Sequence, residues 1–142
     1  MAVFNKFHAF VENLAEKVHN LGADTLKVYL SNATPSASLD SVKADMAEIS
    51  AGNGYTAGGA TPSITSSAQT TGTYKLVLGD VVFTASGGSI GPFQYAVLYN
   101  DTPTSPADPL IGWYDYGSAI TLNDGESLTV DFDPTNGVLT IA

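Results

Sequence analysis

Apolar side chains recur every three or four positions at the start of the chain and alternate with polar ones through most of the rest. The first pattern runs from Phe4 to Leu21 and would line one side of an α-helix. Gly22 follows it, at the place where a glycine commonly ends a helix. The spacing therefore predicts one amphipathic helix over residues 3–21.

The alternating pattern begins near residue 24 and predicts β-strands. "DTLKVYLSN" and "FQYAVLYN" each place their apolar side chains on one face. In "TYKLVLGDVVFTAS" the alternation slips by one position at Gly79-Asp80, which predicts a β-bulge. "ITLNDGESLTVDF" is typical of a hairpin with Asp124-Gly125 in its turn.

Together these segments predict a mainly β chain that forms a single domain over residues 1–142. About eight short strands separated by turns are typical of an antiparallel β-sandwich or barrel, here over residues 24–142. The N-terminal helix would be added to it. A chain of 142 residues is long enough for one hydrophobic core and too short for two ordinary domains.

The charge of the chain is strongly one-sided. Fourteen acidic residues face five basic ones, giving a net charge of −9, and no basic residue follows Lys75. Phosphate binding depends on Lys and Arg, so we exclude nucleic acid as a partner. No stretch approaches the ~18 consecutive apolar residues of a membrane span, and the charged N-terminal segment lacks the apolar core of a signal peptide. We therefore expect no membrane partner.

The stretch "AGNGYTAGGA", residues 51–60, invites comparison with a phosphate-binding loop but lacks the necessary parts. No basic residue lies between Lys43 and Lys75, and a strand-like stretch follows where a helix would be needed. We expect these glycines to supply backbone angles that other residues avoid, with Tyr55 packed among them as an anchor.

Other catalytic and metal sites find no support in the sequence. The chain has no cysteine, and His8 and His19 would lie ~16 Å apart along the predicted helix, too far to share a metal. "DFDPTNG" lacks the ligand spacing of an EF-hand. No pattern suggests a nucleophile beside a histidine. The sequence predicts a protein that is not an enzyme and holds no cofactor or metal.

Candidates for contact with other proteins come from the helix, the loops and the aromatic residues. The helical stripe either covers one end of the sandwich or docks on a neighbouring subunit. The aromatic residues of the later strands favour core or subunit contacts over a sugar-stacking platform, with Trp113 and Tyr114 on opposite faces. The prolines of "NDTPTSPADP" lower the entropy lost when that loop docks. The candidate interface residues are Phe4, Phe7, Phe10, Val11, Leu14, Tyr55, Pro103, Pro106 and Trp113.

Four segments resemble a family of small virion proteins of tailed bacteriophages. They are "DTLKVYLSN", "AEISAGNGYTAGGAT", "QYAVLYNDTPTSPADPLIGWYDYG" and "GESLTVDFDPTNGVLTIA", in the order in which the family has its counterparts. The resemblance covers residues 24–142, and "GYTAGG" and "YAVLY" are its most specific parts.

The resemblance implies a structural component of the virion, made in the bacterial host cytoplasm, without catalysis or cofactor. The first expectation is a capsid decoration (cement) protein that binds the assembled head lattice and stabilises it. The alternative is a tail component, either associated with the tube or acting as a fibre or a host- or glycan-contact protein. The expected partners are the major capsid protein, other virion subunits and further copies of the chain.

Overall fold

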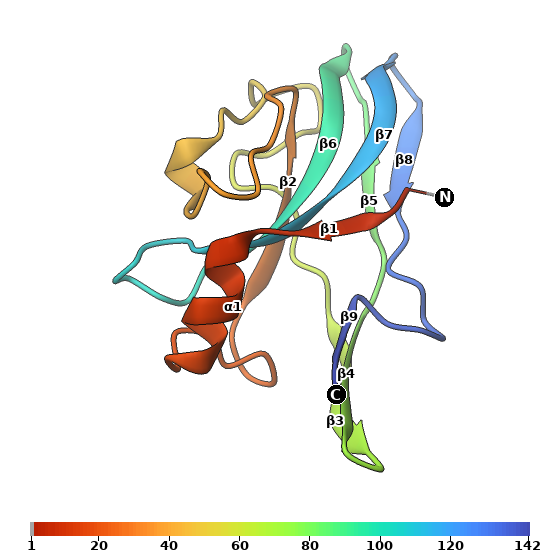
Figure 1. Cartoon of the computed structure of the whole chain (residues 1–142). Helices are drawn as coiled ribbons and strands as arrows, with labels where there is room; N and C mark the ends of the chain where they lie inside the picture. The colour runs from red at the N-terminus through yellow and green to blue at the C-terminus, as the bar shows by residue number, and fades with distance from the viewer. Residues whose placement is uncertain (1) are drawn as a thin grey trace.

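A computed structural model describes residues 2–142 and contains nine β-strands, in antiparallel sheets, with a single α-helix in that range (Figure 1). In chain order the elements are β1 (Phe4–Lys6), α1 (His8–Ala15), β2 (Leu26–Ser31), the 3₁₀ turn η1 (Lys43–Asp45), β3 (Ile64–Thr70), β4 (Thr73–Leu78), β5 (Val81–Thr84), β6 (Ile90–Asn100), β7 (Leu110–Leu122), β8 (Ser127–Val130) and β9 (Leu139–Ile141). No helix within residues 2–142 has the length and apolar character needed to cross a membrane.

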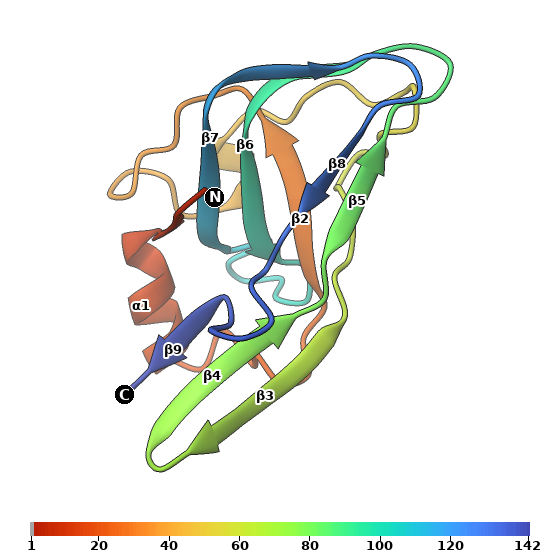
Figure 2. The ribbon, with the colours of Figure 1, turned by 90° about the vertical axis from the view of Figure 1, so that its right-hand side faces the viewer.

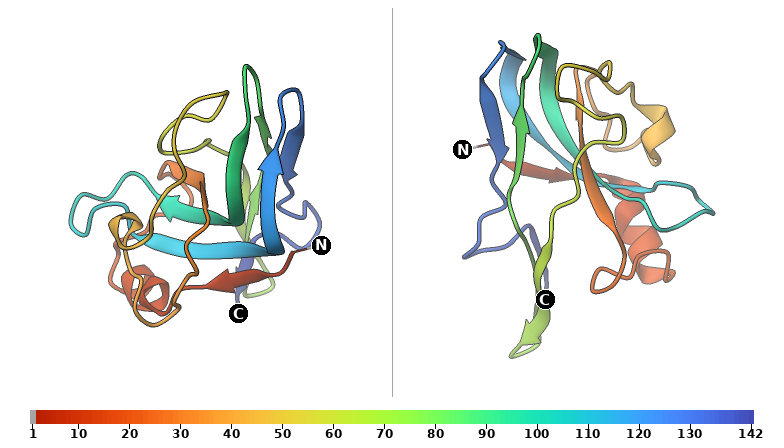
Figure 3. Two further views of the ribbon diagram at one scale, coloured as in Figure 1. Left: turned by 90° about the horizontal axis from the view of Figure 1, so that it is seen from above. Right: turned by 180° about the vertical axis from the view of Figure 1, so that it is seen from behind.

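The strands form a two-layered sandwich that does not close into a barrel. One layer is a four-stranded sheet in the order β1-β7-β6-β2, and the other holds the three-stranded sheet β3-β4-β9 and the ribbon β5-β8 (Figures 1 and 3). Every pairing is antiparallel. The expected mainly β sandwich is confirmed.

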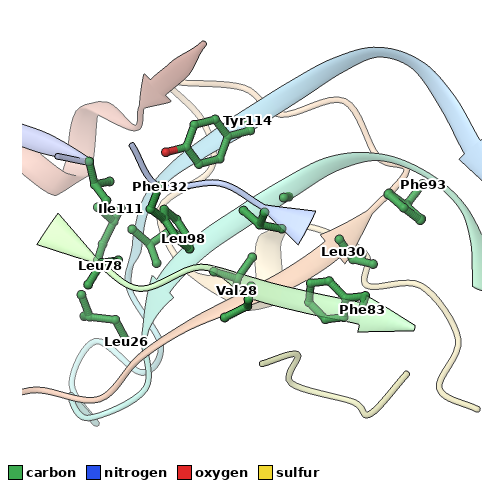
Figure 4. Close-up of a cluster of buried hydrophobic side chains, with 14 of the residues drawn as sticks. Leu26, Val28, Leu30, Leu78, Phe83, Phe93, Leu98, Ile111, Tyr114 and Phe132 are labelled. Carbon is green, nitrogen blue, oxygen red and sulfur yellow. The ribbon is translucent and has the colours of Figure 1, made fainter. Parts of the chain in front are cut away.

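Alternating residues of the long strands fill the space between the two layers. Val28, Leu98 and Ile111 from the four-stranded sheet lie together with Phe83 and Phe132 from the opposite layer (Figure 4). Each such side chain contributes about 1.5–3 kcal/mol when fully buried. This burial is the main stabilising contribution to the sandwich.

The outer face of the four-stranded sheet is also covered. The intervening residues of β2 and β6, including Tyr29, Val97 and Tyr99, pack with Phe7 and Met46 in a second cluster. Met46 belongs to the long segment between β2 and β3. Because both faces are covered, β2 and β6 are buried at nearly every position and do not show the one-sided exposure of a surface strand.

A charged network fastens the segment between β2 and β3. The carboxylate of Glu48 accepts hydrogen bonds from the Tyr55 hydroxyl (2.7 Å), the Gly58 N–H (2.7 Å) and the Lys43 ammonium (2.8 Å). Tyr55 in turn accepts one from the Leu30 N–H of β2 (3.0 Å). Burial tends to raise the pKa of Glu48, but these donors outweigh it and hold the pKa below its usual value.

The glycines of this segment serve the backbone, as the sequence predicts. Gly54 and Gly59 both have positive φ, 97° and 81°. A Cβ atom on Gly54 would overlap the carbonyl oxygen of Thr84, and one on Gly59 would overlap that of Val28. Tyr55 is buried between them in sequence and packs on Phe83, so its role as an anchor is confirmed.

The predicted helix over residues 3–21 is wrong at both ends. Phe4–Lys6 form β1, which pairs with β7, and the absence of a side chain at Gly112 leaves room for the Phe4 ring. The helix ends after Ala15 because Lys17 adopts a φ of 68°. The N–H groups of Lys17 and Val18 then bond back to the last turn in a Schellman-type cap, so Gly22 does not act as the cap.

The predicted hairpin around Asp124-Gly125 is also wrong. The chain does turn there, with φ of 89° at Gly125, but β8 pairs with β5 and lies in the opposite layer from β7. The predicted β-bulge at Gly79-Asp80 is wrong as well, because these two residues lie between β4 and β5, where the chain leaves one sheet and enters the other. There the Asp80 carboxylate accepts a hydrogen bond from the Phe132 N–H (2.9 Å).

Candidate protein-binding groove

An apolar groove of about 440 Å³ lies between α1 and the C-terminal strand β9. Figure 2 shows the two elements beside each other, with α1 next to the end of β9. Val11 and Ile141 form exposed parts of its walls, at 50% and 44% exposure, and Phe10 is buried at its base. The remaining lining residues are Phe4, Lys6, Leu14, Val138, Leu139 and Thr140.

The local sequence explains why this groove stays open. Helix α1 turns Phe10 into the core, while Val11, the next residue, lies 100° further round the helix and faces outward. On the other side, β9 pairs with β4 through Leu139–Ile141, and no strand of the described residues lies on its other edge. The two walls therefore belong to different layers of the sandwich, with apolar side chains between them.

Lys6 is the charged residue among those that line the groove. The chain carries a net charge of −9, so a cation in an apolar groove is a local exception. An occupant of matching chemistry would present apolar side chains and a carboxylate directed at Lys6.

A second cavity, of about 610 Å³, adjoins the groove and shares Leu14 and Ile141 with it. Its walls come from residues 17–24 after the helix, from the β3–β4 hairpin and from the loop between β6 and β7. Pro103 lies on that loop and lines the cavity. Five residues predicted as interface positions therefore line these two neighbouring hollows: the groove has Phe4, Phe10, Val11 and Leu14, and the cavity has Leu14 and Pro103.

A hydrogen-bonded group of polar residues lies beside this cavity. The side-chain amide of Asn100 donates to the Asp24 carboxylate (2.7 Å) and lies 3.1 Å from Nδ1 of His19. Both Asn100 and His19 are buried, and Nε2 of His19 has no hydrogen-bond partner in the part of the chain that the structure describes. Burial lowers the pKa of His19, and the nearby Asp24 carboxylate only partly opposes this. The group connects the segment after α1 to the end of β6.

The lowered pKa of His19 predicts a pH dependence of stability. The unfolded chain binds a proton near pH 6.5 while the folded chain does not until lower pH, so stability is lost as the pH falls below about 6.5. We expect His19→Gln to flatten the slope of the unfolding free energy between about pH 7 and about pH 5, by up to about 1.4 kcal/mol per pH unit. Chemical denaturation at several pH values measures this slope.

His8 provides the control, because it is an exposed residue of α1, whereas His19 is buried in the segment that follows this helix. The His8→Gln variant keeps the wild-type slope on this account. If His19→Gln had the same slope as the wild type, the pH dependence of stability would not come from His19.

The other predicted interface residues lie elsewhere. Phe7 is fully buried and packs against Trp113, with ring centroids 4.6 Å apart, on the outer face of the four-stranded sheet. Trp113 is half-buried there, while Tyr114 faces the core, which confirms their opposite orientations. Tyr55 is buried, and its hydroxyl donates to the Glu48 carboxylate. Pro106 is exposed in the loop between β6 and β7.

Sequence reasoning missed the β9 wall of the groove. Leu139 and Ile141 belong to "VLTIA", which is recognisable as a strand but gives no sign of where that strand lies. The alternation of Leu139 and Ile141 with Thr140 was the signal that these two apolar side chains share one face of the strand. Lys6 was missed because a helix over residues 3–21 would have placed it on the polar side.

Two further observations concern polar side chains. Within residues 2–142 no three His, Cys, Asp or Glu side chains lie close enough to hold a metal ion together. The Ser67 and Tyr74 hydroxyls near the cavity bond to each other (2.8 Å).

Comparison with known protein families, with curated proteins and with solved structures found no match to this chain.

Proposed function

We propose that this protein is a non-enzymatic structural protein of a tailed-bacteriophage virion, and that it binds the assembled head as a decoration protein. The observation that carries the proposal is the apolar groove between α1 and β9, which four residues predicted as interface positions line. The assignment to a virion depends on the sequence resemblance alone.

The chemistry of the groove supports protein binding. Val11 and Ile141 are two of the five large apolar side chains that are exposed to solvent within residues 2–142, and both line the groove, whereas Val3, Leu39 and Val82 do not. Burying such side chains against a partner releases about 25 cal/mol for each Å² of apolar surface removed from water. Lys6 would fix the orientation of the bound head protein by forming an ion pair with one of its carboxylates.

Many copies on a repeating lattice would make a modest contact sufficient. Each copy buries a small apolar area, and a copy that bridges neighbouring head subunits resists their separation. Because the sites recur over the whole head, their effects on its stability add up.

The test uses virions assembled without this chain, to which the purified protein is added. We expect it to bind the heads in many copies and to raise the temperature at which the particles release their DNA. Imaging of labelled protein on the particles gives its location. Binding confined to the tail would favour the tail alternative, and no binding to the particle would overturn the proposal.

A further inference from the structure

Strand β3 has a free edge. It lies at one side of the three-stranded sheet β3-β4-β9 and pairs only with β4. The β3–β4 hairpin extends from the rest of the molecule, and no other strand within residues 2–142 lies along the outer side of β3 (Figures 1 and 2). At seven residues, β3 is longer than the other edge strands of the two larger sheets, β1, β2 and β9.

The hairpin turn determines which backbone groups face outward. Thr71 and Gly72 have φ of 50° and 85°, the positive values of a two-residue type I′ turn. Thr70 and Thr73 flank that turn as a hydrogen-bonded pair, and such pairs alternate along an antiparallel ladder. The N–H and C=O groups of Ser67 and Gln69 therefore point away from β4, into solvent.

The edge of β3 lacks the usual protection against pairing. Natural proteins place charges, prolines or covering segments at such edges. Residues 61–74, "TPSITSSAQTTGTY", contain no charged side chain, and the only proline and the bulge lie at the end nearer the body. By contrast β1 carries Lys6, and the edge of β2 is covered, since Val28 bridges to Ala60 and the Ile49 N–H bonds to Leu30.

The charge of the chain indicates which partner this edge suits. Two identical copies with a net charge of −9 repel each other over most of their surfaces. An uncharged edge is where they can approach at the least electrostatic cost. It also offers identical donors and acceptors to both copies, so that each group finds its complement in an antiparallel arrangement.

We propose that two copies of this chain pair through β3, antiparallel, and join their three-stranded sheets into one continuous sheet. Centred on Ser67, this pairing sets Ser67 opposite Ser67 of the second copy and Thr65 opposite its Gln69. The contact uses the same edge of both copies, so the dimer is closed and does not grow into a filament. The proposal does not depend on binding to a phage head.

The test combines sedimentation with hydrogen exchange on the full chain. Over concentrations from about 1 µM to about 1 mM, we expect a monomer–dimer equilibrium. The amide protons of Ser67 and Gln69 exchange more slowly as the dimer forms. A chain that stays monomeric throughout, or a dimer that leaves these two amides unprotected, would overturn the proposal.

Ala68→Glu tests the edge directly. Ala68 is exposed and lies opposite Lys75 of β4, so a glutamate there keeps the hairpin and gains a cross-strand partner. In the dimer each Ala68 lies opposite Ser66 of the second copy, so the two glutamates become diagonal neighbours of like charge on one face, and we expect dimerisation to weaken by about tenfold. Ser118→Glu adds the same charge at an exposed position of β7 and serves as the control. Equal dimerisation of both variants and the wild type would contradict the pairing.

Discussion

Replacing Gly59 by alanine is expected to destabilise the protein by about 3 kcal/mol or more, whereas the same replacement at Gly72 costs only about 1–2 kcal/mol. Both glycines have nearly the same φ, 81° and 85°, so the strain of a left-handed backbone is common to both variants. They differ in their surroundings. A Cβ atom on Gly72 meets nothing within 4 Å, while one on Gly59 overlaps the carbonyl of Val28.

The overlap at Gly59 cannot be relieved cheaply. Val28 lies in β2, and its N–H and C=O groups both bond to Ala60, the residue after Gly59, at 2.8 and 2.9 Å. Moving the chain away would break this bridge and disturb the Tyr99 hydroxyl, which donates to the carbonyl of Gly58 (2.8 Å). Urea unfolding of the two variants gives the free energies, and equal losses would contradict the role assigned to Gly59.

The strands could be predicted from the sequence because their signal is local. Alternation of apolar and polar residues marks β2 and β4. At Gly79-Asp80 the slip in that alternation predicts a β-bulge, whereas the structure has a change of sheet there. Pairing could not be predicted, because it depends on distant residues. Phe4 fits a helical stripe as well as a strand, and the free edge of β7 beside Gly112 decides between them.

Only part of the candidate site could be predicted, because a local pattern identifies residues of the helix but not the distant strand beside it. The helical stripe identified Val11 and Leu14, which line the groove. The opposite wall comes from β9, more than a hundred residues later in the chain. Phe7 and Trp113 were both plausible surface contacts, but they pack on each other once β1 pairs with β7. Such mutual burial is not visible in either local pattern.

Val11→Gln is expected to weaken binding to phage heads by about tenfold to a hundredfold. The substitution removes an apolar contact and leaves an unpaired amide in the contact, at a cost of about 1–3 kcal/mol. It introduces no charge, so Lys6 does not complicate the comparison. Val11 is half-exposed on a surface helix, and glutamine is a good helix former, so the fold is retained.

Val82→Gln is the matched control. Val82 is 56% exposed on β5, close to the 50% of Val11, but does not line the groove. If binding depended only on the total exposed apolar surface, both variants would bind the heads more weakly. If binding uses the groove, only Val11→Gln binds more weakly.

In the function that we propose, the groove between α1 and β9 binds a protein of the phage head. Co-sedimentation of wild type, Val11→Gln and Val82→Gln with heads that lack the chain, titrated to saturation, tests it most directly. The account predicts wild-type affinity for Val82→Gln and an affinity at least about tenfold lower for Val11→Gln. Saturation of the heads by Val11→Gln at the same concentration as wild type would contradict it.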